Sequence, residues 1–328
     1  MNVCKSIVRK SISLAACLAV LCAAGTSAAQ EYPSRSVRLV VPYPPGGGAD
    51  TLARVVGTRL AKHWGHPVVV ENRVGAGGNI AFTSIVNSDP DGYTLLLTPN
   101  GIATNASLLK NPPYDPIRDF APITMLATVP MFLVVNASIP VNTVGELLAF
   151  IKAKPGQTTF GSAGNGTSLH LASELLKMQT GVDMTHVPYK VAAPAVVDLL
   201  AGRITMVFST VTPVLAHLKS GKLRALGVTT PRRSTLFPDL PTVAEAGVAG
   251  YELVGWFGLF SRAGTPKAII DKVYQDTVAV LKDPEVRGRM AQEGMEVAGT
   301  TPEQSSSILR KTIVDEAKLV KASGIPIE

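Results

Sequence analysis

The stretch that decides the fold is Val37-Arg-Leu-Val-Val-Pro-Tyr-Pro-Pro-Gly-Gly-Gly-Ala-Asp50. An apolar run stops at a cluster of prolines and glycines, and a helical pattern begins directly after it. Four apolar residues fall on one face of that helix: Leu52, Val55, Val56 and Leu60. Asp50 stands where a cap residue accepts hydrogen bonds from first-turn N–H groups. The stretch therefore predicts a strand over 37–41, a tight loop, and a helix over 50–64.

Gly46, Gly47 and Gly48 make the loop a candidate anion-binding site. Glycine lets the backbone approach a ligand closely, and the helix N-terminus behind it carries a partial positive charge. The loop is not a nucleotide P-loop, because Ala49-Asp50-Thr51 stands where a Gly-Lys-Ser/Thr ending would be required, and it has no G-x-G-x-x-G fingerprint. From these residues alone, an ordinary strand-to-helix turn without a ligand is an equal alternative.

The first 29 residues have the pattern of a secretory leader. Lys5, Arg9 and Lys10 precede a small and apolar run over 12–24, and Ser27-Ala28-Ala29 fits the small-residue rule of a signal peptidase site. The run is shorter than the ~20 residues that a membrane span needs. We therefore predict a signal peptide over 1–29, cleaved after Ala29, and export. Lipidation at Cys17 is the minor alternative, because the residues before it resemble a lipoprotein cleavage box.

Charge and cysteine content narrow the class of partner. All three cysteines, Cys4, Cys17 and Cys22, lie in the leader, so the exported chain has no disulfide. The formal net charge is +7, and removing the three leader cations leaves +4. The basic residues are scattered and aromatics are scarce, so we expect no nucleic-acid binding. A mildly cationic exported protein suits small anionic ligands instead.

Strand and helix signals alternate along the chain, which predicts α/β architecture with largely parallel sheets. The alternation restarts in the middle of the chain. The long apolar runs over 125–135 and 253–261 are candidates for segments that pass between two lobes. We therefore expect lobe 1 to comprise residues 30–128 plus 254–328 and lobe 2 to comprise residues 129–253, with a ligand site between them.

The second half has its own glycine loop, Phe160-Gly-Ser-Ala-Gly-Asn-Gly-Thr-Ser-Leu-His170. Ser162, Thr167 and Ser168 add hydroxyl donors, although a serine or threonine at that point also caps the following helix. Neither glycine loop contains lysine or arginine. Hydrogen bonds to a charged group contribute roughly 1.5–3 kcal/mol each, so three or four neutral donors supply most of the ~8 kcal/mol of a micromolar complex.

Six motifs in order along the chain resemble those of the Bug-type (TctC-like) substrate-binding proteins of tripartite tricarboxylate transporters. They are Val41-Pro-Tyr-Pro-Pro-Gly-Gly-Gly-Ala-Asp50, Val70-Glu-Asn-Arg-Val-Gly-Ala-Gly-Gly-Asn79, Asp91-Gly-Tyr-Thr-Leu95, Tyr114-Asp-Pro-Ile-Arg-Asp-Phe120, Gly161-Ser-Ala-Gly-Asn-Gly-Thr-Ser-Leu-His170 and Val187-Pro-Tyr-Lys190. The resemblance implies a two-lobed, type II periplasmic-binding-protein-like α/β fold that closes on a small organic acid. It also implies a periplasmic location, and delivery of the acid to the membrane subunits of such a transporter.

The resemblance also implies which residues contact the ligand. In the family the two glycine loops grip one carboxylate, partly through ordered waters. The matching positions here are Tyr43, Gly46, Gly47, Gly48, Ala49 and Asp50 in the first loop, and Ser162, Ala163, Gly166, Thr167 and His170 in the second. Asn100 from lobe 1, and Tyr189, Asp198 and Ser209 from lobe 2, are further expected cleft residues. The sequence departs from the family at Val191, where a glycine is usual, so the identity of the acid is not transferable.

Several alternatives stay open at this point. We expect His170 to be a neutral imidazole that donates one hydrogen bond, with a purely structural role as the alternative. Asp198 as a solvent-facing carboxylate is the alternative to a ligand role. A hydrolase built on Ser162, His170 and Asp198 is disfavoured because no G-x-S-x-G elbow is present. A carboxylate sensor that signals through a membrane receptor would have the same binding chemistry. We expect a monomer without catalytic residues, metal or cofactor.

Overall fold

The computed structural model describes residues 32–325 and 327. The predicted leader, its cleavage after Ala29 and the alternative anchor at Cys17 lie outside the described residues. By its internal contacts the chain divides after Arg35, and the elements below belong to the unit that begins at Ser36. No helix among the described residues is long and apolar enough to cross a membrane.

The opening stretch folds as the expected strand, loop and helix. The strand β1 (Val37–Val41) is buried at every position except Arg38, and the helix α2 (Gly48–Trp64) ends at Gly65 in the left-handed conformation. Leu52, Val56 and Leu60 bury the apolar side of α2. The helix begins two residues earlier than predicted. Gly47 is its N-cap and makes no side-chain cap bond, so Asp50 lies inside the first turn and is not the cap.

The strands form two sheets. The six-stranded sheet has the order β11-β4-β10-β3-β1-β2. Its remaining strands are β2 Val68–Asn72, β3 Thr94–Pro99, β4 Phe120–Val129, β10 Gly255–Arg262 and β11 Glu296–Val297. The five-stranded sheet has the order β7-β6-β8-β5-β9. Its strands are β5 Phe132–Asn136, β6 Thr159–Ser162, β7 Thr185–Pro188, β8 Met206–Ser209 and β9 Leu223–Val228.

Both sheets are mixed, which corrects the expectation of largely parallel sheets. In the six-stranded sheet β1 is parallel to β2 and β3, but β10 is antiparallel to β3 and β4. In the five-stranded sheet β6 is parallel to β7 and β8, but β5 is antiparallel to β8 and β9. The antiparallel pairings come from β4, β5 and β10, which lie in the two long apolar runs noted above, and burial on both faces does not set strand direction.

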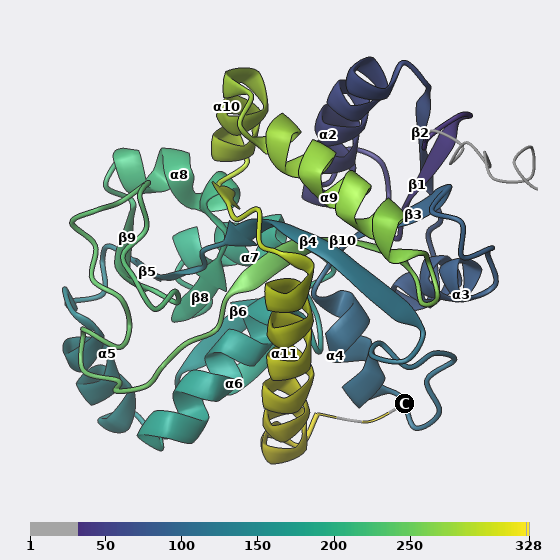
Figure 1. The fold of residues 1–328 in the computed structure, drawn as a ribbon. Coiled ribbons are helices and arrows are strands. Elements are labelled where there is room, and N and C mark those ends of the chain that lie inside the picture. Colours follow the sequence, from purple (N-terminus) through teal and green to yellow (C-terminus); the bar gives the residue numbers. More distant parts are fainter. Residues whose placement is uncertain (1–31, 326, 328) are drawn as a thin grey trace, which may run out of the picture. The chain divides into compact units, whose positions relative to one another are not determined.

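Helices cover both faces of each sheet (Figure 1). The helices not yet given are α3 Asn79–Val86, α4 Gly101–Leu108, α5 Val144–Lys152, α6 Ser168–Thr180, α7 Ala192–Leu200, α8 Val211–Lys219, α9 Lys267–Leu281, α10 Pro284–Gln292 and α11 Pro302–Ser323. On the six-stranded sheet, α2 and α9 cover one face, and α3, α4 and α11 cover the other. On the five-stranded sheet, α5 and α6 cover one face, and α7 and α8 the other.

The chain changes sheets where long apolar runs were noted. It leaves the six-stranded sheet at the end of β4, passes Pro130 and Met131, and enters the five-stranded sheet as β5. It returns to the six-stranded sheet as β10. The exact lobe limits given above stay a prediction. The last helix, α11, packs on β4 of the six-stranded sheet and on α4, which covers that sheet. It also contacts α6, which covers the five-stranded sheet.

Candidate functional site

The first glycine loop is held by Asp50 from within α2. Its carboxylate accepts hydrogen bonds from the Gly46 N–H (2.9 Å), from Nδ2 of Asn72 (3.0 Å) and from Nε of Arg54 (3.0 Å). The bond from Arg54 is the main cause of the lowered pKa of Asp50, against the opposing effect of burial. The predicted capping role is therefore wrong. The Asp50 side chain points back into the loop and fixes its shape.

Backbone groups of this loop remain open to a ligand. The first intrahelical bond of α2 runs from the Thr51 N–H to the Gly47 carbonyl (2.9 Å), so the N–H groups of Gly48, Ala49 and Asp50 precede it. A Cβ at Gly46 would meet no atom within 4 Å, whereas one at Gly48 would lie 3.1 Å from Cε of Met295. Gly46 has a φ of +85°, which favours glycine. The loop thus presents its backbone to solvent.

The second glycine loop uses its hydroxyls internally. Ser162 ends β6 and is buried; its Oγ lies 2.7 Å from Nε2 of His186, donates to the Gly164 carbonyl and accepts from the Gly164 N–H. Thr167 is the N-cap of α6, where its Oγ1 accepts from the His170 N–H and donates to the same Gly164 carbonyl (2.8 Å). Thr167 therefore caps α6, which was the alternative to a role of its hydroxyl as a donor to the ligand. The next two N–H groups, of Ser168 and Leu169, precede the first intrahelical bond of α6, from Leu171 to Thr167.

His170 makes its contacts inside the protein. Its side chain is buried, Nδ1 accepts a hydrogen bond from the Gly166 N–H (3.1 Å), and Nε2 lies 3.7 Å from Oε1 of Glu174. Because Nδ1 is an acceptor here, the proton of the neutral ring belongs on Nε2, which faces Glu174. The Nε2 donor is therefore directed at Glu174, and the neutral state of the ring stays a prediction.

Glu174 is the acidic partner of His170 in this contact. Burial alone would raise its pKa, but hydrogen bonds from His170 and Lys177 outweigh burial and hold the pKa below its ordinary value. Lys177 lies 2.9 Å from the carboxylate. His170, Glu174 and Lys177 on α6 therefore interact with one another behind the loop.

His186 on β7 was not recognised from the sequence. Its ring stacks on His170 with centroids 3.8 Å apart and on Phe160 at 4.8 Å. Burial, followed by the charge of His170, lowers the pKa of His186 to about 4. The contact depends on the pairing register of β6 and β7, in which Phe160 stands beside His186. No local sequence pattern marks that register.

Asn100 connects three elements at the start of α4. Its Nδ2 donates to Oε1 of Glu316 on α11 (2.7 Å) and to Oγ of Ser168 at the start of α6 (3.1 Å), and Thr104 donates to the other oxygen of Glu316. Glu316 is buried, and burial raises its pKa to about 7. The structure therefore brings Asn100 beside the second glycine loop. Glu316, far along the chain, was missed by the sequence reasoning.

Tyr43 links the first loop to the same helix start. A Cβ on Gly101 would stand 2.5 Å from the Tyr43 hydroxyl, so the ring lies directly against the backbone at which α4 begins. Burial raises the pKa of Tyr43 to about 12, so the hydroxyl keeps its proton. Through Tyr43 and Asn100, the start of α4 contacts both glycine loops. The N-termini of α4 and α6 are therefore linked through Asn100 and Ser168, and the loop that leads into α2 contacts the same start of α4.

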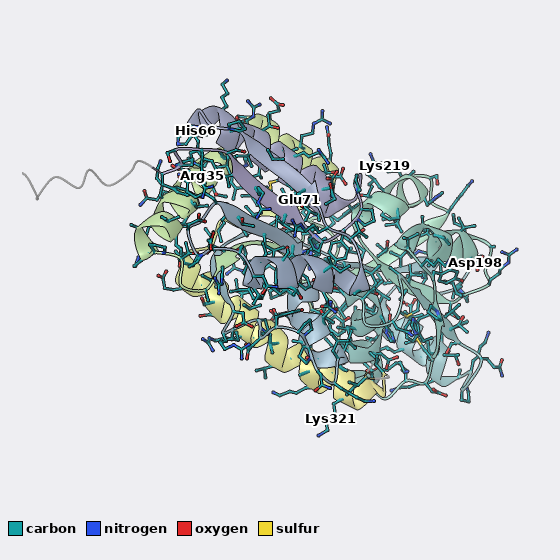
Figure 2. The ribbon with its side chains drawn as sticks, turned by 90° about the vertical axis from the view of Figure 1, so that its right-hand side faces the viewer. Arg35, His66, Glu71, Asp198, Lys219 and Lys321 are labelled. Atoms are coloured by element: carbon teal, nitrogen blue, oxygen red, sulfur yellow. The ribbon has the colours of Figure 1, made fainter. Side chains whose placement is uncertain are left out.

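The remaining predicted residues, Tyr189, Asp198 and Ser209, make hydrogen bonds to other residues of the protein. The Tyr189 hydroxyl donates to Oδ2 of Asp198 (2.6 Å), and Arg203 donates to its Oδ1 (2.8 Å), so the carboxylate already has two partners. Figure 2 shows Asp198 at the outer margin of the part that carries α7 and α8, on the side away from His66. Ser209 is buried and donates to the Thr210 carbonyl.

The hydrolase alternative is contradicted by these contacts. Ser162 is 1% exposed and pairs with His186, not with His170. Asp198 is engaged by Tyr189 and Arg203. The triad of Ser162, His170 and Asp198 is therefore not assembled. Within residues 32–325, no cluster of three or more histidine, cysteine or acidic side chains is arranged to hold a metal ion.

Comparison with known proteins identifies the family. Residues 52–325 match the family described as tripartite tricarboxylate transporter family receptor. A structure of R. palustris Rpa4515 with adipate is 36% identical, covers 90% of this chain and 99% of its own, and superposes with a TM-score of 0.77. The periplasmic binding protein BugD is 36% identical over 90% of this chain and 99% of its own, with a TM-score of 0.74.

A third solved structure is MatC from Rhodopseudomonas palustris with bound malate. It is 29% identical, covers 88% of this chain and all of its own, and has a TM-score of 0.73. Two mixed sheets, each covered on both faces, correspond to the two-lobed architecture of these proteins. The chain therefore belongs to the family of tripartite tricarboxylate transporter receptors and has the two-lobed α/β fold of its solute-binding proteins.

Proposed function

We propose that this protein captures a small mono- or dicarboxylate between its two lobes, in the periplasm, and delivers it to the membrane subunits of a tripartite tricarboxylate-type transporter. The observation that carries the proposal is that the start of α4 contacts both glycine loops, each of which leads into a helix N-terminus, that of α2 or that of α6. Such termini offer unpaired N–H groups and a partial positive charge, which suit an anion.

The chemistry favours a carboxylate over a phosphate ester. Among the residues of the two loops there is no lysine or arginine, so the ligand's charge is met by neutral N–H groups. Two such groups come from Gly48 and Ala49, and two from Ser168 and Leu169. At roughly 1.5–3 kcal/mol for each charge-assisted hydrogen bond, four donors account for micromolar affinity. Adipate and malate, found in two relatives, support this ligand class.

The direct test is a ligand screen on the exported form of the protein. Calorimetry and thermal shift with aliphatic mono- and dicarboxylates, including adipate and malate, should yield at least one saturable, one-to-one interaction. Hydroxy, aromatic and amino acids extend the screen, because Val191 stands where the family usually has glycine. Failure of every acid to bind would refute the proposal.

A matched pair of variants tests the backbone donors. Ser168 is the first residue of α6, a position where proline fits, and Thr167 before it has φ −68° and ψ 156°, which a following proline accepts. Ser168→Pro removes the N–H and the hydroxyl, while Ser168→Ala removes the hydroxyl alone. We expect affinity about tenfold to a hundredfold lower in Ser168→Pro than in Ser168→Ala, the value of one charge-assisted bond. Equal affinities would move the carboxylate away from α6.

Location and delivery need experiments of their own. We propose export with cleavage after Ala29, which intact-mass analysis of the periplasmic fraction decides; a lipid-sized mass increase at Cys17 would support the anchor instead. We propose that the exported protein is a monomer, measured by light scattering. Delivery is tested by uptake of the identified acid into vesicles that contain the membrane subunits. Binding without stimulated uptake would favour the sensor alternative.

A further inference from the structure

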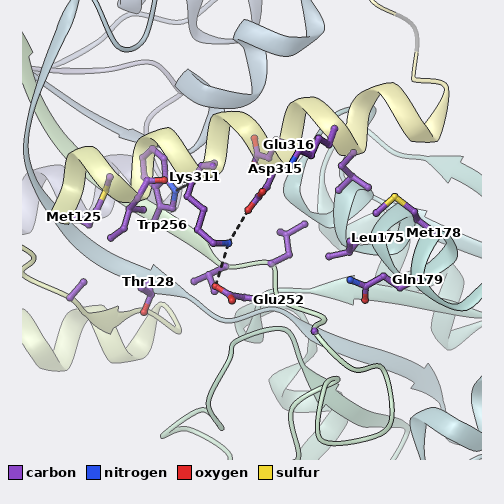
Figure 3. A pocket seen from close by; sticks show the side chains of 18 of the residues that line it. Met125, Thr128, Leu175, Met178, Gln179, Glu252, Trp256, Lys311, Asp315 and Glu316 are labelled. Atoms are coloured by element: carbon purple, nitrogen blue, oxygen red, sulfur yellow. Dashed lines mark hydrogen bonds and ion pairs between the residues drawn. The ribbon is translucent and has the colours of Figure 1, made fainter. Parts of the chain in front are cut away.

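A cavity lies beneath α11, apart from the glycine loops. Its volume is about 490 Å³, within the ~300–1,000 Å³ of small-molecule sites. The walls come from β4, α6, β10 with the segment before it, and α11 (Figure 3). None of the residues over 43–50 or 162–170 lines it. The cavity is therefore not part of the proposed carboxylate site.

The inner wall of this cavity is apolar. Met125, Trp256 and Leu319 are each less than 5% exposed, and Leu175 and Ile308 face them from α6 and α11. The wall combines an indole ring with flexible methionine and leucine side chains, which adapt to a hydrophobic body of varied shape. Covering apolar surface of this kind stabilises a complex by roughly 25 cal/mol per Å² removed from water, before the cost of association.

The polar groups of Trp256, Thr312 and Glu316 in this wall already have partners. The Trp256 Nε1–H donates to Oγ1 of Thr312 (3.1 Å), and Thr312 in turn donates to the Ile308 carbonyl. The carboxyl of Glu316 is taken by Asn100 and Thr104. A polar ligand would lose its hydration in the inner part without gaining these bonds, a cost that an apolar ligand does not meet.

Charges at the mouth balance one another. Lys311 lies 2.8 Å from Asp315 and 3.9 Å from Glu252, and Figure 3 shows it reaching between them. Lys318 is the other cation of the lining, so two cations stand against the two carboxylates Asp315 and Glu252. The mouth therefore favours neither an anion nor a cation.

We propose that this cavity binds a neutral, largely apolar small molecule with an aromatic or alicyclic frame, and that its occupancy is coupled to the carboxylate site. The coupling part rests on the proposed function. We infer the coupling because one 13-residue helix, α6, reaches both sites. Its residues Leu175 and Met178 line the cavity, and its first residue, Ser168, belongs to the second glycine loop. An occupant that shifts α6 changes both sites, and the coupling is reciprocal.

The probe for the cavity is N-phenyl-1-naphthylamine, a neutral fluorophore that brightens in apolar surroundings. We expect saturable, one-site fluorescence enhancement with the full exported protein. Ile308→Trp fills the cavity from α11, and Leu175→Trp fills it from α6 should the first variant fold poorly. Each should weaken probe binding by about tenfold or more, because added bulk occupies the space of the probe.

The matched control is Val314→Trp, on the same helix but 50% exposed and outside the cavity lining. It should bind the probe as the unaltered protein does. Absence of saturable binding, or equal weakening by the control, would overturn the cavity assignment. Adipate affinity, or that of the acid found in the screen, should change severalfold with bound probe, and an unchanged value would overturn the coupling. If no acid binds, the proposed function fails while the probe titration still decides the cavity.

Discussion

Replacing Glu316 with glutamine should make the protein more stable at neutral and alkaline pH. Burial raises the pKa of Glu316 from its ordinary 4.5 to about 7. One pKa unit corresponds to 1.36 kcal/mol, so ionising this group in the folded state costs roughly 3 kcal/mol relative to the unfolded chain. The stability that the protonated form contributes is fully present below pH ~4.5 and is lost as pH rises through about 7.

Glutamine can replace the protonated acid without breaking the network. Its carbonyl oxygen can accept from Nδ2 of Asn100, and its amide can donate to Oγ1 of Thr104. Thr104 in turn already lies 3.2 Å from the Asn100 carbonyl, to which its hydroxyl then donates. Each buried polar atom thus keeps a partner, so the usual penalty for an orphaned group does not arise.

The assay is urea unfolding at intervals from pH 4 to pH 8.5. We expect the free energy of unfolding of Glu316→Gln, minus that of the unaltered protein, to rise by about 3 kcal/mol over that range, mostly between pH 4.5 and 7. Asp315→Asn is the control, because Asp315 is adjacent, half-exposed and paired with Lys311 at the surface. A flat difference curve, or a variant less stable than the unaltered protein at pH 8, would refute the reasoning.

Three further predictions follow from single contacts. His186→Phe keeps the ring stack and removes a group whose pKa is lowered to about 4. The neutral His186 ring contributes stability that is present above pH 6.5 and is lost as pH falls through 4. Unfolding curves should therefore show that the stability of the variant is less sensitive to acid. Asp50→Asn should cost about 1–3 kcal/mol in thermal melts by weakening a buried acceptor of three donors, with unchanged stability arguing against its role. Gly166 and Gly156 have similar φ angles of +70° and +71°, but a Cβ added at Gly166 would lie 2.4 Å from Cδ1 of Leu108, whereas one at Gly156 would meet no atom within 4 Å. Gly166→Ala should therefore lower the melting temperature more than Gly156→Ala. Equal losses would show that Leu108 moves aside at no cost.

Local signals predicted the elements that local chemistry determines. The strand β1 has the predicted limits. The start of the long helix α11 is also set locally, because Thr301 and Gln304 form a capping box and Pro302 stands in the first turn. Helix α4 was not predicted, since its sequence of small and polar residues over 101–108 lacks a clear apolar stripe. It is held by packing against β3 and α11, which operates over a long sequence separation.

In the candidate site, too, the sequence revealed the features that depend on neighbouring residues and missed those that depend on distant ones. The two loops were found because glycines before a helix leave a local mark. His186 and Glu316 were not found, because each acts through a partner on a different element: Phe160 and Ser162 across a strand pair for the first, and Asn100 from far along the chain for the second. A single titratable residue in a strand or a long helix has no pattern that reveals such a partner.

The side chains that mark the two loops in the sequence serve mainly to hold the loops. Asp50 binds the Gly46 N–H, while Ser162 and Thr167 both bind Gly164. What they leave facing outward is backbone, at the starts of α2 and α6. Alanine substitutions at these positions would therefore disturb loop geometry and ligand binding together, and would not separate the two. Removing one N–H by proline, with alanine at the same position as the reference, measures the donor itself, which is why Ser168 is the position that most directly decides where the carboxylate binds.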